Sequence, residues 1–317
     1  MNDAIVEHSH EIIRKGSKSF AAAAWLFDRR TRGKAYMLYA WCRHCDDQID
    51  GQDLGFGTAD MTAAERLARL EALRASTRAA FLGKPMSDPV FIAFQRVARE
   101  ASIPQRHAME LLAGFEMDVQ GVRYPDLPET LLYCYRVAGV VGVMMAYVMG
   151  VREKEALARA ADLGIAFQLT NIARDVLDDA ANRRCYLPAS WLREAGIPEG
   201  GHAEPAHRAA VVGVVERLLA EADRYYLSAK HGLKALPLRS AWAVSTALGV
   251  YREIGEIVRA RGVAAWDRRA VVSRPRKAWH GISGFARALK ATTLDRWSGG
   301  QPREQTLWTV GDLGLED

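Results

Sequence analysis

The chain has little of several features that mark special classes of protein. Its 317 residues include only four cysteines, 11 prolines and 26 glycines, which excludes a disulfide scaffold, a collagen-like repeat and a disordered low-complexity chain. Lysine and arginine outnumber aspartate and glutamate by 43 to 38, and a net charge of +5 is too small to indicate a nucleic-acid partner. With 49% apolar residues, the composition is that of an ordinary globular protein.

Long hydrophobic runs are also missing. The longest run extends from Val137 to Val151 between two arginines, which is shorter than the about 20 residues that a membrane-spanning helix needs. The run therefore predicts a buried core helix. The N-terminal segment MNDAIVEHSHEIIRKG is polar and charged, unlike a secretory signal, so we expect a cytoplasmic protein.

The four cysteines do not form a recognisable metal or disulfide motif. Cys42 and Cys45 are spaced as CxxC, but no second pair of Cys or His residues stands nearby to complete a tetrahedral zinc site. We therefore expect reduced thiols carried on a helix.

Helical periodicity dominates the rest of the chain. Apolar residues recur at intervals of three and four, whereas alternating runs and hairpin dipeptides are missing. We predict one all-α domain of about ten helices over residues 1–294, followed by an irregular C-terminal extension over 295–317, although length alone suggests two domains. The clearest predicted helices span residues 61–81, 89–101, 104–119, 157–176, 206–229 and 241–258.

The segment YAWCRHCDDQID places polar residues on one face of a predicted helix. Tyr39, Arg43, Asp46 and Asp50 have offsets of 0, 4, 7 and 11, which share a face over about 16 Å. We call these four residues the first stripe. Two carboxylates four residues apart destabilise a helix slightly unless a cation neutralises them.

The segment FQLTNIARDVLDD repeats this arrangement. Gln168, Asn171, Asp175 and Asp179 have offsets of 0, 3, 7 and 11, and we call them the second stripe. The other faces of this helix are apolar, so the pair of carboxylates is costly unless it is paired or bound to metal. One such stripe could be a solvated face, but two favour a cation site.

Hard oxygen ligands at this spacing suit Mg²⁺, which commonly takes one or two carboxylates and fills its remaining positions with water and substrate phosphate. Two facing acidic helices in a bundle would hold several Mg²⁺ ions and, through them, a diphosphate. Arg43 adds a fixed positive charge to the first stripe.

These residues carry a family likeness. DDQID (46–50) and DVLDD (175–179, preceded by QLTNIAR) resemble the two aspartate-rich motifs of the squalene/phytoene synthase family, most like its bacterial phytoene synthases. Further similar segments are SKSF (17–20), YCYRVAGVVG (133–142), RRCYLP (183–188) and YREI (251–254). Together they follow the family order over most of the chain.

The resemblance implies an isoprenoid synthase fold, a terpenoid synthase-like helical bundle with a central cavity. It also implies a prenyltransferase of carotenoid biosynthesis, which joins two geranylgeranyl diphosphates head to head. The first half-reaction yields prephytoene diphosphate, and the second ionises and rearranges it to phytoene, releasing the second diphosphate. Mg²⁺ is the expected cofactor, Mn²⁺ is a substitute, and NADPH is not expected.

The resemblance assigns roles to particular residues. Metal ligands are expected at Asp46, Asp50, Asn171, Asp175 and Asp179. Tyr39, Arg43 and Tyr251 join the four aspartates as catalytic residues. Asp47 and Asp178 lie off the stripes and are expected to support them. The expected substrate-binding residues are Ser17, Ser19, Phe20, Arg43, Gln168, Asn171, Arg174, Tyr186, Arg269 and Lys277.

Two features remain open to more than one interpretation. Gly139 and Gly142 either leave room for a prenyl chain or allow close packing of helices, and Phe20 and Trp25 are either cavity aromatics or core. Residues 252–296 hold eleven basic and four acidic residues. This stretch fits a diphosphate site, a solvated face or an anionic membrane surface, so we expect peripheral association with the inner face of the membrane. We also expect contacts with other carotenoid enzymes.

Three alternative functions are each compatible with part of this pattern. A C30 dehydrosqualene or squalene-type synthase would use farnesyl diphosphate at the same site, and the squalene type would need NADPH, for which no Gly-rich dinucleotide fingerprint is present. DDQID by itself also fits a head-to-tail prenyl elongase, but the other motifs do not. A non-catalytic scaffold protein of the family would have no need of four carboxylates on two stripes.

Overall fold

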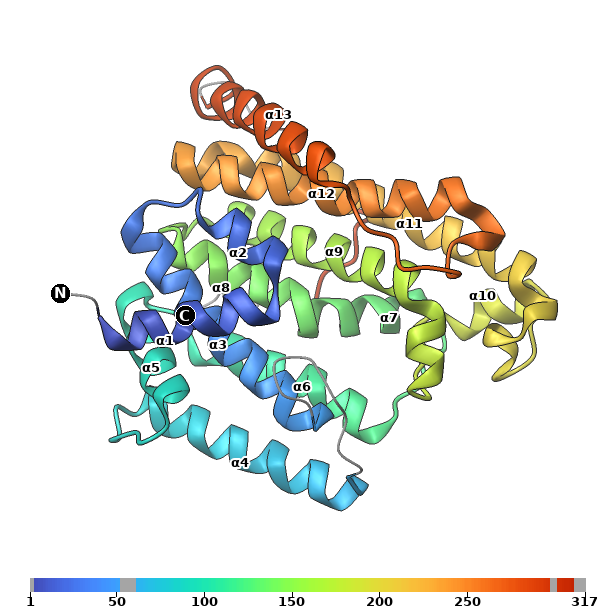
Figure 1. Ribbon diagram of the computed structural model, residues 1–317, viewed down its shortest axis with the longest axis horizontal. Helices are drawn as coiled ribbons and strands as arrows, with labels where there is room; N and C mark the ends of the chain where they lie inside the picture. The colour runs from blue at the N-terminus through green and yellow to red at the C-terminus, as the bar shows by residue number, and fades with distance from the viewer. Residues whose placement is uncertain (1–2, 52–60, 297–300, 311–317) are drawn as a thin grey trace.

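The computed structural model describes residues 3–51, 61–296 and 301–310. Within these ranges the chain is helical and contains no strand, so the predicted all-α class is confirmed (Figure 1). The α-helices are α1 (Ala4–Gly16), α2 (Lys18–Ala24), α3 (Arg29–Asp50), α4 (Ala63–Phe81), α5 (Pro89–Ala101), α6 (Gln105–Gln120), α7 (Leu127–Cys134), α8 (Val140–Val148), α9 (Lys154–Ala181), α10 (Ala189–Glu194), α11 (Arg208–Gly232), α12 (Leu238–Arg261) and α13 (Arg274–Thr293).

Helix boundaries follow local signals in the sequence. α4 begins after Thr62, whose hydroxyl accepts a hydrogen bond from the Glu65 amide at 3.2 Å while the Glu65 carboxylate accepts one from the Thr62 amide at 2.7 Å. α12 begins directly after Pro237. All six predicted helices are present, with ends within a few residues of those expected.

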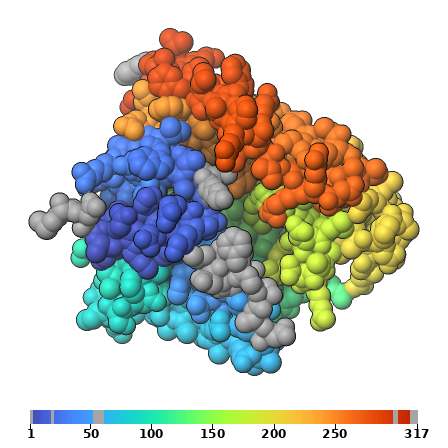
Figure 2. Space-filling model, in the orientation of Figure 1, coloured from blue at the N-terminus to red at the C-terminus, as the bar shows by residue number. Residues whose placement is uncertain are grey.

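Helix α9 lies at the centre of the bundle. It packs against α8, α11 and α12, and α3 packs on α1 and α5 nearby (Figure 1). α13 packs on the outer side of α12, at the edge of the molecule (Figures 1 and 2). The space between α2, α3, α8, α9 and α12 contains the cavity described below.

The longest apolar run forms a core helix, as predicted. α7, a π-helical turn at Tyr135–Gly139 and α8 form one continuous helix, Leu127–Val148. By length and composition alone its 22 residues could cross a membrane, with a mean hydropathy of 1.6 in the most apolar window, but 61% of that window is buried inside the protein. Val140 and Met144 are completely buried.

Glycines allow α8 and α9 to approach closely. A Cβ atom on Gly142 would lie 2.2 Å from the carbonyl oxygen of Ala160, and one on Gly164 would lie 2.2 Å from that of Ala138. Gly142 lines the cavity, yet a side chain at this position would collide with the backbone of α9 and would not extend into the cavity. Of the two interpretations of this segment, close helix packing is the one that the contacts support.

Residues 301–310 are irregular and lie across α9 and α11. Arg303 donates hydrogen bonds to both oxygens of the buried Asp162 carboxylate at 2.8 and 2.7 Å. The carbonyl of Gln301 accepts a hydrogen bond from Arg159 at 2.5 Å, and Arg159 lines one end of the cavity. This part of the extension therefore supports a wall of the cavity.

Candidate active site

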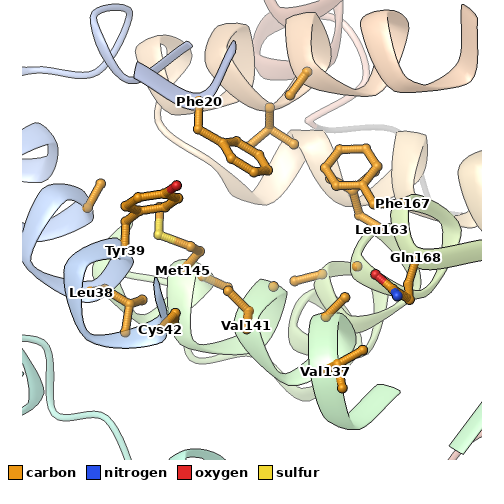
Figure 3. A pocket seen from close by; sticks show the side chains of 18 of the residues that line it. Phe20, Leu38, Tyr39, Cys42, Val137, Val141, Met145, Leu163, Phe167 and Gln168 are labelled. Carbon is orange, nitrogen blue, oxygen red and sulfur yellow. The ribbon is translucent and has the colours of Figure 1, made fainter. Parts of the chain in front are cut away.

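A cavity of about 480 Å³ runs between the helices, with an apolar body and a polar mouth. Side chains of the π-helical turn, α8 and α9, among them Val137, Val141, Met145 and Leu163, form one wall (Figure 3). Its size is typical of a site for one or two small organic ligands. Polar groups gather at one end, where the lining includes Tyr39, Arg43, Asp46, Asp118, Gln168, Asn171 and Arg184.

The first stripe is carried by the C-terminal half of α3. Tyr39, Arg43 and Asp46 line the cavity, and Arg43 forms ion pairs with Asp46 at 2.9 Å and with Asp47 at 3.3 Å. The helix ends after Asp50, because Gly51 adopts a left-handed conformation (φ 65°) that favours glycine. Asp50 is therefore the last residue of α3, beyond the cavity lining.

The second stripe lies on α9, which is not a regular helix along its whole length. Asp175 has φ −107° and ψ 16°, so the helix bends where one straight stripe was expected. Arg174 donates to Asp175 at 2.8 Å through Nε and makes a second, shorter contact through Nη2. Side chains of neighbouring residues do not face each other on a regular helix, which accounts for the departure from helical geometry.

Gln168 and Asn171, before the bend, line the cavity, whereas Asp175 and Asp179 lie farther along the helix. The Asn171 amide nitrogen donates to Gln168 at 3.3 Å. The Asn171 Oδ1 atom is buried without a hydrogen-bond partner, which leaves an oxygen ligand available at the mouth.

Two residues that were not predicted from the sequence lie beside the stripes at the cavity mouth. Arg184 donates from both terminal nitrogens to Asp50, at 2.5 and 3.3 Å. Asp118, on α6, accepts hydrogen bonds from the hydroxyls of Tyr186 at 2.8 Å and Tyr133 at 3.1 Å. Both lie at the cavity mouth, so the acidic region includes a third carboxylate-bearing helix.

Burial and mutual repulsion raise the pKa values of three carboxyl groups. The pKa of Asp46 is raised to about 7, chiefly by burial and then by Asp50, and the opposing charge of Arg43 does not compensate. Burial, then Asp175, raises the pKa of Asp179 to about 7. The pKa of Asp118 is raised to about 6 by burial, against the lowering effect of Arg184 and the tyrosine hydroxyls.

The mouth has more negative than positive charge. Four arginines face seven aspartates, so full ionisation leaves three negative charges uncompensated. The aspartates are Asp46, Asp47, Asp50, Asp118, Asp175, Asp178 and Asp179, and the arginines are Arg43, Arg174, Arg184 and Arg269. Within the described ranges, no three Asp, Glu, His or Cys side chains form a ready-made metal cluster, since arginines hold several of the carboxylates. The excess of hard oxygen ligands nevertheless fits Mg²⁺, which needs only one or two protein carboxylates per ion.

Aromatic side chains surround the boundary between mouth and body. Phe167 stacks on Tyr251 with ring centroids 4.1 Å apart, and Phe20 lies 5.9 Å from Tyr251 and 6.1 Å from Tyr39. Figure 3 shows Phe20, Tyr39 and Phe167 beside the cavity. Their faces can stabilise positive charge that develops beside them. Trp25 does not belong to this group, because it is 59% exposed and packs against Arg32.

Comparison with known proteins agrees with this geometry. The sequence model of the squalene/phytoene synthase family matches residues 13–276. The chain belongs to the squalene/phytoene synthase family. It is 50% identical to a phytoene synthase of Pseudescherichia vulneris over 96% of this chain and 97% of that one. It is 48% identical to a 15-cis-phytoene synthase of Pantoea ananas over 97% and 98% of the two chains.

A solved structure of the same fold is also similar. A dehydrosqualene synthase crystallised with a ligand superposes with a TM-score of 0.79 at 27% identity, covering 89% of this chain and 96% of that one. The matched segment of the squalene/phytoene synthase family contains both stripes but ends at the first turn of α13.

Other residues expected from the family motifs lie at varying distances from the cavity. Ser17 caps α2 by accepting a hydrogen bond from the Phe20 amide at 3.2 Å, and the side chain of Ser19 lies outside the described residues. Arg269 donates to Asp175 at 3.1 Å and to Asp178 at 3.2 Å. Lys277 lies in the first turn of α13 and does not line the cavity.

Of Arg184 and Asp118, only Arg184 has a signal in the sequence. Arg184 lies within the RRCYLP motif that carries the family resemblance. Asp118 is one acidic residue near the end of a predicted amphipathic helix, and its spacing gives no sign that α6 meets the two acidic helices. Only the packing of α6 brings it there.

Proposed function

We propose that this chain is a phytoene synthase, which condenses two geranylgeranyl diphosphates head to head. The observation that carries the proposal is an acidic, arginine-rich mouth on an apolar cavity, in a chain about half identical to phytoene synthases along nearly its full length. In the first half-reaction one diphosphate and one proton leave as the carbon skeletons join through a cyclopropane ring in prephytoene diphosphate. In the second, the remaining diphosphate leaves, the carbocation rearranges, and loss of one proton gives phytoene.

The residues at the mouth suit departure of a diphosphate. Asp46, Asp50, Asn171, Asp175 and Asp179 are the residues that would hold Mg²⁺, or Mn²⁺ in its place, and the bound ions would neutralise the leaving group. Arg43 and Arg184 line the cavity beside them and supply fixed positive charge toward the same group. Arg269 is 54% exposed at the rim and can reorient toward an incoming diphosphate.

The cavity body suits the prenyl chains and the carbocation. Its wall, formed largely by valine, alanine, methionine and leucine side chains, is mostly apolar and disfavours water near the carbocation. Phe20, Tyr39, Phe167 and Tyr251 present aromatic faces between this wall and the acidic mouth. No step of the proposed reaction needs a reductant, so NADPH is not required.

The test is product identification with purified protein, Mg²⁺ and either C15 or C20 prenyl diphosphate, without NADPH. The proposal predicts a C40 triene hydrocarbon from geranylgeranyl diphosphate. A C30 product alone would instead assign a dehydrosqualene-type reaction, the activity named for the dehydrosqualene synthase of similar fold. Strict dependence on NADPH would indicate a squalene-type reaction and contradict the proposal.

A further inference from the structure

Helix α13 presents a stripe of large apolar side chains on its outer face. Trp279, Ile282, Phe285 and Leu289 are 56%, 68%, 41% and 42% exposed, and they follow one another at intervals of three and four residues. The opposite face is small and buried, with Gly284 close to Thr246 of α12. Within this stripe Phe285 packs edge to face against Trp242 of α12, with ring centroids 5.2 Å apart, and all four side chains remain at least 41% exposed.

The charges of α13 have one sign. Its twenty residues include five lysines and arginines and no aspartate or glutamate. Arg274 and Lys290 are exposed, and on a helix of 3.6 residues per turn they lie on the two borders of the apolar stripe. Arg276 forms an ion pair with Glu253 of α12. Arg287 points inward and donates a hydrogen bond to the Ser245 hydroxyl at 3.0 Å.

The stripe is one helix away from the cavity. Val244, Ala247 and Tyr251 of α12 line the cavity, while another face of α12 holds α13 through a hydrogen bond of 2.8 Å from the Trp242 indole to the Gly281 carbonyl. Figure 1 shows α13 outside α12, at the edge of the bundle. Most of α13 also lies beyond residue 276, where the match to the family model ends.

We propose that the outer face of α13 docks on an anionic phospholipid surface, with Trp279, Ile282, Phe285 and Leu289 inserted at the level of the headgroups. Apolar and aromatic residues bordered by lysine and arginine are what a helix lying in the plane of a membrane interface needs. Each bordering cation gains energy near anionic headgroups.

The charges that border the stripe favour an anionic phospholipid surface over a second copy of the chain. A twofold contact between two α13 stripes would place Arg274 and Lys290 of each copy near the same residues of the other, with no carboxylate on either helix to pair with them. Like charges brought together in this way disfavour the association. An anionic bilayer matches both the apolar stripe and its borders.

The experiment is flotation of the full chain with vesicles of phosphatidylcholine alone, or of phosphatidylcholine mixed with phosphatidylglycerol, without substrate. The chain should float with the anionic vesicles and be released by high salt. Arg274→Gln with Lys290→Gln should weaken this binding about 25-fold, since each cation contributes about a fivefold gain. Ile282→Ser with Leu289→Ser should weaken it at least about tenfold.

The control variants make the same types of substitution on the surface away from α13. Leu67→Ser with Leu227→Ser alters two exposed leucines on α4 and α11, and Arg78→Gln with Lys84→Gln removes two exposed cations at the end of α4. Both control pairs should float like the unaltered chain, and all variants should keep its circular dichroism spectrum and thermal midpoint.

Three outcomes would overturn the proposal: no flotation of the unaltered chain, equal loss in the α13 and control pairs, or dissociation of a dimer by Ile282→Ser with Leu289→Ser in the absence of vesicles. The last would show that the stripe binds a second copy. Since no substrate is present, none of these results bears on the proposed condensation reaction.

Discussion

Asp50, the last residue of α3, accepts two hydrogen bonds from Arg184, which follows α9 and lies 134 residues later in the chain. The ion pair links the ends of the two acidic helices. Arg184 also interacts with the charge of Asp118, and these carboxylates together raise the pKa of its guanidinium. One arginine thus partly neutralises carboxylates from two helices, α3 and α6.

Arg184→Gln should reduce both stability and turnover. Loss of the cation leaves the half-buried Asp50 without its partner, so we expect the free energy of unfolding in urea to fall by about 1 to 3 kcal/mol. Arg123→Gln is a suitable control, because it removes an arginine from an ion pair with Glu199 in which the side chains are 82% and 75% exposed. That control should change stability by less than about 0.5 kcal/mol. An equal effect of the two substitutions would show that Arg184 has no special role.

Asp118→Asn should change how stability depends on pH. The pKa of Asp118 is raised from 3.8 to about 6 in the folded protein, so the folded state keeps this proton while the unfolded state loses it. The contribution of Asp118 to the free energy of unfolding therefore falls as pH rises from about 4 to about 6, and it is constant above that range. Asparagine does not titrate and can still accept from Tyr133 and Tyr186.

The free energy of unfolding of the variant should consequently exceed that of the unaltered protein by about 2 to 3 kcal/mol at about pH 7.5, and the two should be equal at about pH 4. Urea unfolding of both proteins with metal removed by chelator measures the difference at each pH. A difference in unfolding free energy that is the same at all pH values would contradict a raised pKa for Asp118.

Gly142→Ala should destabilise the fold by about 2 kcal/mol or more, because the new methyl group would collide with the carbonyl oxygen of Ala160. Gly213→Ala, in the second turn of α11, is the matched control. Nothing lies within 4 Å of a Cβ atom there, so alanine should stabilise that helix by up to about 1 kcal/mol. Thermal melts of the two variants should therefore shift in opposite directions, and a shift in the same direction would mean that α8 and α9 are not closely packed.

Periodic features of the sequence predicted more than isolated ones. The helices and the two stripes follow from residue spacing, because a helix repeats every 3.6 residues whatever it packs against. The bend at Asp175 did not follow, since it depends on ion pairs with Arg174 and with Arg269, 94 residues away. Asp118 was missed for the same reason, because its role depends on which helix α6 meets. Gly142 could be read in two ways until the position of Ala160 was known.

The claim that the two acidic stripes form one site is tested most directly by turnover of Asp46→Ala, Asp175→Ala and the double variant. Asp267→Ala serves as the control, since it removes an exposed aspartate of an ion pair away from the cavity. Geranylgeranyl diphosphate and Mg²⁺ are supplied, and the hydrocarbon product is measured.

Each single variant should fold normally and lose at least about 100-fold in turnover, and the double variant should lose little more, because groups that act together at one reaction are not additive. Asp267→Ala should remain active. Near-normal turnover in Asp46→Ala and Asp175→Ala would show that the stripes are structural and would contradict the account.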